Sequence, residues 1–272
     1  LKVRLDPVDD AAFAAAAGAP RSAIFVERPR GQGMPAMPDD GVLRVVLDPG
    51  HGGIDPGAEA GGLVEAELML TFARELRDVL LRAGGFSVAM TRSDDVFVPL
   101  ETRITLAREA GVEVFLSLHA DALPESAGRA SGATIYTLSE DASDLASRKL
   151  AERHDQSDLL AGVDLSGQSD EIALVLMDLA RRDTAPRADR LADELVWGMS
   201  GTLGRLNSRP RRSAAFSVLK APDFPSVLIE LGFLSSARDR ERLADPDWRA
   251  QAAAGIRDGL RRWAEAEAPI RN

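Results

Sequence analysis

Two of the three histidines in this chain stand where predicted buried strands end, and this pattern constrains the fold more than any other feature. An apolar run, Val42–Leu47, stops at the turn Asp48–Gly53, which contains His51. A second apolar run, Val112–Leu118, is followed directly by His119. Open α/β sheets bind ligands at the carboxyl ends of their parallel strands. We therefore predict an α/β fold in which one edge of the sheet carries both imidazoles.

The composition limits the kinds of function that the chain can have. Its 272 residues are enough for one large domain with a tail, and 45% hydrophobic residues suffice for a core. A net charge of −10 argues against a nucleic-acid partner, which would require a basic surface. No apolar run approaches the ~20 residues of a membrane span. The absence of cysteine excludes disulfides and thiolate metal sites, so metal chemistry would depend on histidine and carboxylates.

The chain is predicted to contain a tail, a linker and one larger domain. Residues 1–18 begin with alternating apolar residues and continue into an alanine-rich stretch, as expected for the end of an upstream domain. Residues 19–41 are rich in proline and glycine, which predicts a linker. The compact domain is expected over residues 42–268. The chain starts at Leu1 without a signal-peptide pattern, so we expect it to be part of a longer protein.

Strands and helices are predicted to alternate in the compact domain. Apolar residues at helical spacing predict a helix with Glu65 in its first turn. A second helix is expected over Leu100–Ala110, with Leu106 facing the core and Arg103 facing solvent. Further strands are expected at Phe86–Thr91, Thr134–Leu138, Phe216–Leu219 and Pro225–Leu231, and Trp248 to Trp263 are expected in a packed final helix.

Residues 139–212 have a different character from the rest of the domain. They are polar and helical, and they are longer than the single crossover helix expected between neighbouring strands, so we interpret them as an insertion. Breaks in its helices are expected at Gly162–Asp170 and around Pro186. Within this insertion, Asp141–His154 is predicted to be helical.

The helix Asp141–His154 is predicted to point its histidine toward the core. Its apolar face carries Leu145 and Leu150, and His154 lies one turn past Leu150 on that face. Glu152 lies ~200° around the helix from Leu150 and is expected in solvent.

Four residues can converge at the predicted sheet edge. They are His51, His119, Glu65 at its helix start and Glu230, which closes the apolar run Val227–Leu231. Two imidazoles and one carboxylate suit Zn²⁺ and leave a fourth position for water. Glu230 could then accept the proton of that water and deliver it to a leaving amine, because its apolar surroundings should raise its pKa.

Structural roles would explain each of these residues taken singly, but they explain less well why two of only three histidines end separate buried strands. A strand-end histidine can be a hydrogen-bonded structural residue, Glu65 can favour the positive end of a helix, and Glu230 can pair with an arginine. For Asp48 and Asp121 we expect hydrogen bonds that support the site.

Four motifs in the same order resemble the zinc-dependent N-acetylmuramoyl-L-alanine amidases of bacterial cell division, the amidase_3 family. They are Val46–Gly53, Glu65 at the start of its helix, Ser117–Asp121 and Val227–Ser235. The resemblance covers Val42 to about Trp263. It implies a mostly parallel, twisted sheet of about six strands with helices on both faces.

The resemblance also implies a function and a location. His51, Glu65 and His119 would bind Zn²⁺, and Glu230 would be the catalytic carboxylate. The substrate would be peptidoglycan, cut between N-acetylmuramic acid and the L-alanine of the stem peptide during cell separation in the Gram-negative periplasm. Residues 1–18 would then be the tail of an AMIN-like domain. Two rival interpretations are a zinc peptidase that cuts within the stem peptide and a wall-binding module without catalysis.

Some division amidases carry an insertion whose helix blocks the zinc site until an activator binds, and residues 139–212 resemble it. The blocking residue of the family is usually a glutamate, whereas here His154 stands at that place. We hypothesise that His154 is an inhibitory zinc ligand; a solvated histidine, or Glu152 as the ligand, are the alternatives. The apolar stretch Ile172–Leu179 would suit docking of a LytM-type activator or packing onto the domain. We expect a monomer.

Overall fold

The computed structural model describes residues 40–122, 131–160 and 171–268, without the side chains of residues 155–160 and 171–180. The predicted tail 1–18, the linker up to residue 39 and the predicted helix break at 162–170 lie outside the described residues.

Within the described part of the chain, six strands form one sheet in the order β4-β1-β5-β8-β6-β7. Strands β4, β1, β5 and β8 are parallel, β6 is antiparallel to β8, and β7 is parallel to β6. The predicted mostly parallel, six-stranded sheet is therefore confirmed. The strands are β1 (Leu43–Pro49), β4 (Phe86–Met90), β5 (Val114–His119), β6 (Thr134–Leu138), β7 (Arg211–Ala214) and β8 (Ser226–Glu230), with a separate hairpin of β2 (Glu59–Ala60) and β3 (Leu63–Val64).

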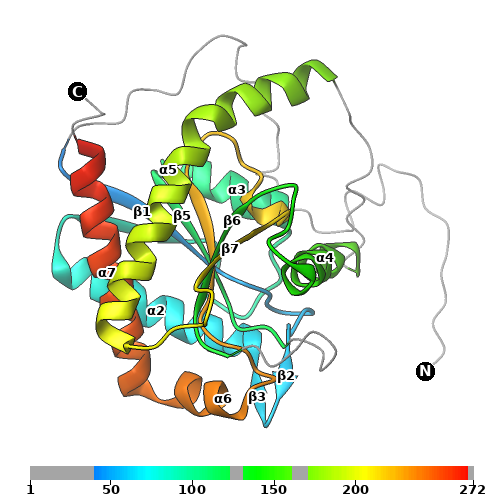
Figure 1. Ribbon diagram of the computed structural model, residues 1–272, viewed down its shortest axis with the longest axis vertical. Helices are drawn as coiled ribbons and strands as arrows, with labels where there is room; N and C mark the ends of the chain where they lie inside the picture. The colour runs from blue at the N-terminus through cyan, green and yellow to red at the C-terminus, as the bar shows by residue number, and fades with distance from the viewer. Residues whose placement is uncertain (1–39, 123–130, 161–170, 269–272) are drawn as a thin grey trace. The chain divides into compact units, whose positions relative to one another are not determined.

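Helices cover both faces of this sheet, as predicted (Figure 1). They are α2 (Glu65–Ala83), α3 (Leu100–Glu109), α4 (Leu145–Leu160), α5 (Glu171–Leu203), α6 (Ala237–Ala244), α7 (Pro246–Glu267) and the 3₁₀ helix η2 (Ser217–Leu219). Side chains alternate along each strand, so Val45 and Leu47 pack with α2, α5 and α7, whereas Val46 packs with α3, α4 and η2. Two hydrophobic cores result, one on each face.

The orientation predicted for α3 is wrong at two positions. Arg103 is buried, with 4% of its surface exposed, whereas Leu106 is 36% exposed. The reason is an ion pair: Arg103 Nη1 lies 2.8 Å from Asp48 Oδ1 beneath the sheet edge. A buried carboxylate offsets much of the cost of burying a guanidinium, and hydrophobic periodicity does not register such pairs.

The helix break predicted at Pro186 is also wrong, because α5 continues through it. Contacts on both sides hold this helix in place. Before the proline, Thr184 Oγ1 donates a hydrogen bond to the carbonyl of Pro222 at 3.1 Å. After it, Leu191 and Leu195 are fully buried in the core. This tertiary packing outweighs the one helical hydrogen bond that proline removes.

The later part of the predicted insertion contributes directly to the sheet and its core. The second half of α5 packs against α7, and β7 extends the sheet beside β6. The strand predicted at Phe216–Leu219 is wrong: β7 lies earlier in the chain, and η2 occupies Ser217–Leu219. No helix among residues 40–122, 131–160 and 171–268 is long and apolar enough to cross a membrane.

Candidate metal centre

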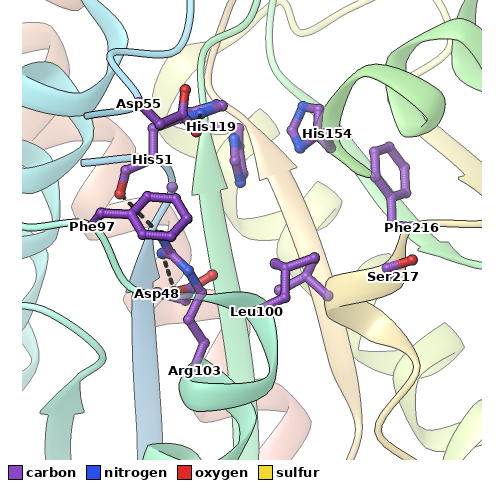
Figure 2. A pocket seen from close by; sticks show the side chains of 12 residues that line it. Asp48, His51, Asp55, Phe97, Leu100, Arg103, His119, His154, Phe216 and Ser217 are labelled. Atoms are coloured by element: carbon purple, nitrogen blue, oxygen red, sulfur yellow. Dashed lines mark hydrogen bonds and ion pairs between the residues drawn. The ribbon is translucent and has the colours of Figure 1, made fainter. Parts of the chain in front are cut away.

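Three side chains that the sequence suggested as metal ligands meet at one edge of the sheet. His51 follows β1, Glu65 is the first residue of α2, and His119 ends β5. One potential ligand atom from each residue lies within 4.8 Å of the other two. The rings of His51 and His119 face the same space (Figure 2), with centroids 5.1 Å apart. The predicted convergence of these residues is therefore observed.

Glu65 lies at the centre of this cluster. Its Oε1 atom is 3.1 Å from His119 Nδ1 and 3.4 Å from His51 Nε2. The main-chain N–H groups of Ala58 and Ala120 donate hydrogen bonds to its two oxygens, each at 2.9 Å. Burial favours the neutral acid, but His51 and His119 outweigh it and hold the pKa of Glu65 well below its usual value. Glu65 is thus an anion at neutral pH, as a carboxylate metal ligand must be.

His51 is held in an unusual conformation, and one of its ring nitrogens forms no hydrogen bond among the described residues. Its φ of 58° lies in the left-handed region that residues other than glycine rarely adopt. Its Nδ1 is 2.7 Å from Asp55 Oδ2, which orients the ring so that Nε2 faces Glu65. That Nε2 is buried and has no hydrogen-bond partner among the described residues. Burial opposes protonation, but Glu65 and Asp55 raise the pKa of His51 to about 10 in the metal-free protein.

Two glycines make room for this cluster. A Cβ atom on Gly50 would lie 2.2 Å from His119 Cε1, and one on Gly57 would lie 2.8 Å from Glu65 Oε2.

Burial, and then the neighbouring His154, lower the pKa of His119 to about 4. The imidazole of His119 is therefore neutral at pH 7 and retains a lone pair for a metal.

Glu230 completes the predicted constellation. It ends β8 as the register partner of His119 and is fully buried. Its Oε2 accepts a hydrogen bond from the N–H of Asp121 at 3.1 Å, whereas its Oε1 has no partner among the described residues. Burial, and then the charges of Glu65 and Asp121, raise the pKa of Glu230 well above its usual value. A carboxyl group of this kind can both accept and donate a proton near neutral pH.

Asp48 lies beneath the cluster and supports it. Its carboxylate accepts hydrogen bonds from Thr91 Oγ1 at 2.6 Å, Ser117 Oγ at 2.8 Å and Arg103 Nη1 at 2.8 Å. Burial would raise the pKa of Asp48, but these partners lower it below the usual value. Arg103 also donates to the carbonyl oxygen of His51 at 3.0 Å. The supporting position expected for Asp48 is observed, whereas that of Arg103 was missed because it was expected in solvent.

Helix α4 places His154 next to the cluster (Figure 2). The ring centroid of His154 lies 4.2 Å from that of His119 and 5.8 Å from that of His51. Its Nε2 is 3.6 Å from both Asp121 Oδ2 and Glu230 Oε1, and it has no hydrogen-bond partner in the described part of the chain.

The helix periodicity predicted for α4 is correct near His154 and wrong at its start. Leu150 is buried and Glu152 is exposed, as expected, but Leu145 is 62% exposed. Arg153 holds the middle of α4 against the site, because its Nη1 lies 3.1 Å from Asp121 Oδ1 and donates a hydrogen bond to the carbonyl of Ala122.

A pocket opens beside the three imidazoles, between α3, η2 and α4. Apolar side chains on these elements and the polar residues of the site share its lining, which includes Phe97, Leu100, Phe216, Val218, Asp48 and Arg103. The apolar stretch Ile172–Leu179, predicted as a docking surface, belongs to the part of α5 whose side chains are not described.

Comparisons with known proteins agree with this geometry. Residues 45–262 match the family described as N-acetylmuramoyl-L-alanine amidase, Amidase_3. Amidase AmiC of Neisseria meningitidis is 38% identical over 80% of this chain and 52% of its own length. Amidase AmiA of Escherichia coli is 35% identical over 79% of this chain and 74% of its own length. The chain thus spans about half the length of the first relative.

Solved structures share the fold. An N-acetylmuramoyl-L-alanine amidase from Clostridium difficile superposes with a TM-score of 0.62 at 21% identity, covering 84% of this chain and 99% of that one.

Proposed function

Because the chain belongs to the N-acetylmuramoyl-L-alanine amidase family, we propose that it hydrolyses the amide bond between N-acetylmuramic acid and L-alanine in peptidoglycan. The observation that carries this proposal is the convergence of His51, Glu65 and His119 beside Glu230. Three donors for a metal and one separate carboxyl group with a raised pKa are what metal-assisted amide hydrolysis needs.

The donor set fits zinc better than it fits magnesium or calcium. Two imidazoles and one carboxylate are a borderline-hard combination, whereas the other two ions prefer oxygen alone. The Nε2 of His51 supports the same conclusion. It is buried and forms no hydrogen bond among the described residues, with Glu65 Oε1 at 3.4 Å, and a metal would satisfy it. Asp55 would fix the tautomer of His51 from the other side of the ring. When bound, zinc would supply Lewis acidity that activates water and polarises the substrate carbonyl.

Glu230 would handle the protons of the reaction. The N–H of Asp121 fixes one of its oxygens, which leaves Oε1 directed into the site. Its raised pKa allows it to accept a proton from the attacking water and to donate it to the departing amine of L-alanine. Both transfers use one carboxyl group, so cleavage returns Glu230 to its starting state.

We further propose that α4 inhibits the enzyme in this conformation. His154 occupies the space that His119 and Glu230 line, and its unpaired Nε2 supports a role as an additional, inhibitory zinc ligand. Glu152 is the weaker candidate because it is exposed on the same helix. Opening of the site would require α4 to leave, and a LytM-type activator acting on the segment 139–212 is the partner that we propose for this step.

The proposed setting is peptidoglycan remodelling during cell separation in the periplasm. The named relatives from Gram-negative bacteria support this setting. The negative net charge offers no electrostatic attraction to an anionic wall, so localisation would depend on other parts of a longer protein or on a partner.

Product analysis tests the proposed reaction. The zinc-loaded protein and its His154→Ala variant are incubated with defined muropeptides. The products are separated by chromatography and identified by mass spectrometry. An amidase releases intact stem peptide with a free L-alanine amine and leaves the saccharide unmodified. Shortened stem peptides would identify a zinc peptidase instead. Unchanged muropeptides that nevertheless remain bound to the protein would identify a wall-binding module.

A further inference from the structure

One buried arginine, Arg92, donates hydrogen bonds to four main-chain carbonyl oxygens. Its Nε donates to Pro49 at 2.9 Å, its Nη1 to Asp94 at 3.2 Å, and its Nη2 to both Gly50 and Ala66 at 2.8 Å. Only 3% of the residue is exposed. A planar guanidinium group presents its donors in a rigid fork, so these four bonds fix the positions of three separate segments relative to one another.

Two of these segments carry the candidate metal ligands. Gly50 immediately precedes His51, and Ala66 immediately follows Glu65. The Nη2 atom of Arg92 bridges their carbonyl oxygens, so one nitrogen spans the backbones from which the two ligands project. Packing around this side chain is tight, because a Cβ on Gly52 would lie 3.0 Å from Arg92 Nε.

Burial of the Arg92 guanidinium is energetically unfavourable. Within the described residues no carboxylate forms an ion pair with it. The negative charges of Asp48 and Asp95 favour its charged form from a distance, but the cost of burial outweighs them. Burial, and then the neighbouring Arg103, lower the pKa of Arg92 to about 10, so it remains charged at pH 7. Arg103 shares the carbonyl of Pro49 with it and is compensated by Asp48. Unfavourable burial of this kind is characteristic of functional sites.

We propose that Arg92 is a positioning residue that holds His51 and Glu65 at the separation required for joint metal binding. The inference rests on the metal centre of the proposed function. His51 needs such support because its left-handed backbone is strained and would relax if the turn were released. Lysine cannot replace this arginine, because one ammonium nitrogen cannot reach carbonyl oxygens on three segments with fork geometry.

The test measures zinc affinity by competition with a chromophoric chelator, using the full chain well below its melting temperature. Arg92→Lys should raise the zinc Kd about 10- to 100-fold, the range found when groups that orient metal ligands are lost. The matched control is Arg249→Lys. Arg249 is also buried, near the start of α7, and donates to the carbonyls of Leu243 and Ala244. It also pairs with Glu75 at 2.8 Å, in the middle of α2 and away from the ligand at the start of that helix. Its variant should keep the wild-type zinc Kd.

The melting temperature of each metal-free variant separates stability from positioning. Equal losses of thermal stability in the two variants, with zinc affinity lost only in Arg92→Lys, support the proposal. Wild-type zinc affinity in Arg92→Lys, or equal loss in Arg249→Lys, overturns it. Failure of Arg92→Lys and Arg92→Gln to unfold cooperatively, while Arg249→Lys does so, also overturns it in favour of a general folding role. If the wild-type protein itself binds no zinc, the proposed metal centre fails rather than the role of Arg92.

Discussion

His154 Nε2 lies 3.6 Å from Glu230 Oε1, and neither atom has a hydrogen-bond partner among the described residues. An unsatisfied buried polar atom costs about 1–3 kcal/mol. Two such atoms facing each other mean that α4 is held over the site by other contacts, among them those of Arg153 with Asp121. Without metal, the covered state is therefore expected to lie only a few kcal/mol from an open one.

Removal of the His154 side chain should activate the enzyme. His154→Ala is expected to raise the basal rate of dye release from labelled peptidoglycan by more than about tenfold, which corresponds to ~1.4 kcal/mol in the equilibrium between covered and open states. Glu152→Ala is the control, because Glu152 belongs to the same helix but is exposed. An equal rise in both variants would point to general loosening of α4, and no rise in either would contradict inhibition by His154.

Removal of the proton-transfer group should stop catalysis without removing the metal. In a His154→Ala background, Glu230→Gln is expected to lower kcat by about 10²- to 10⁴-fold, the usual contribution of general acid–base catalysis. Zinc content should stay at the wild-type value. Glu113→Gln serves as control. Glu113 is another buried glutamate and accepts a hydrogen bond from Arg44 N, but it directly precedes the first residue of β5, at the end of the strand away from His119. Retained activity in Glu230→Gln would exclude the assigned role.

A methyl group on Gly50 should disturb the ligand ring above it. Gly50→Ala places a Cβ 2.2 Å from His119 Cε1, and overpacking of this kind costs about 1–3 kcal/mol. We expect a lower melting temperature and a weaker zinc affinity. Gly201→Ala is the comparison, because nothing lies within 4 Å of its Cβ and α5 is helical there. That variant should be as stable as wild type or up to ~1 kcal/mol more stable.

Removal of the metal should destabilise the folded domain. A ligand that binds only the folded state stabilises it by ~2.7 kcal/mol at a free concentration one hundred times its Kd. Zinc added to the chelator-treated protein is thus expected to raise the melting temperature measured by calorimetry. His119→Ala should abolish this shift, and a shift of wild-type size in that variant would place the metal elsewhere.

The pairing of Glu267 with α5 predicts a pH dependence of stability. Burial opposes ionisation of Glu267, but hydrogen bonds from Arg190 and Arg187 outweigh it and lower its pKa below 4.5. A lowered folded-state pKa contributes stability above the unfolded value, and this contribution disappears as the pH falls through the folded-state pKa. At pH 7, Glu267→Gln should therefore lower the melting temperature of the metal-free protein by about 2–4 °C. The difference in melting temperature between the variant and the wild type should vanish well below pH 4.5. A difference that stayed constant with pH would contradict the pairing.

The sheet and the convergence of four candidate site residues could be predicted because each position follows from a local pattern. His119 and Glu230 each close an apolar run of strand length, and parallel strands bring such ends to one edge. Glu65 could be placed because it starts a helix with clear apolar periodicity. These patterns require only neighbouring residues and the regular geometry of strands and helices.

The supporting residues could not be predicted because their partners are distant in sequence. Arg103 and Arg92 look like solvent-facing charges in their own segments, and only the folded turn at Pro49 and Gly50 supplies the carbonyl oxygens that they bind. The helix break predicted at Pro186 was wrong for a similar reason, since packing of α5 on both sides of the proline is a property of the tertiary structure.

Helix α4 belongs to the same polypeptide as the site that it covers, and this covalent connection sets how the enzyme can respond. If α4 inhibits as proposed, its effective concentration at the site is fixed by the chain and does not fall when the protein is diluted. The fraction of molecules with α4 over the site should therefore be the same at low and high protein concentration. Only a molecule that binds the uncovered form more tightly can change this fraction.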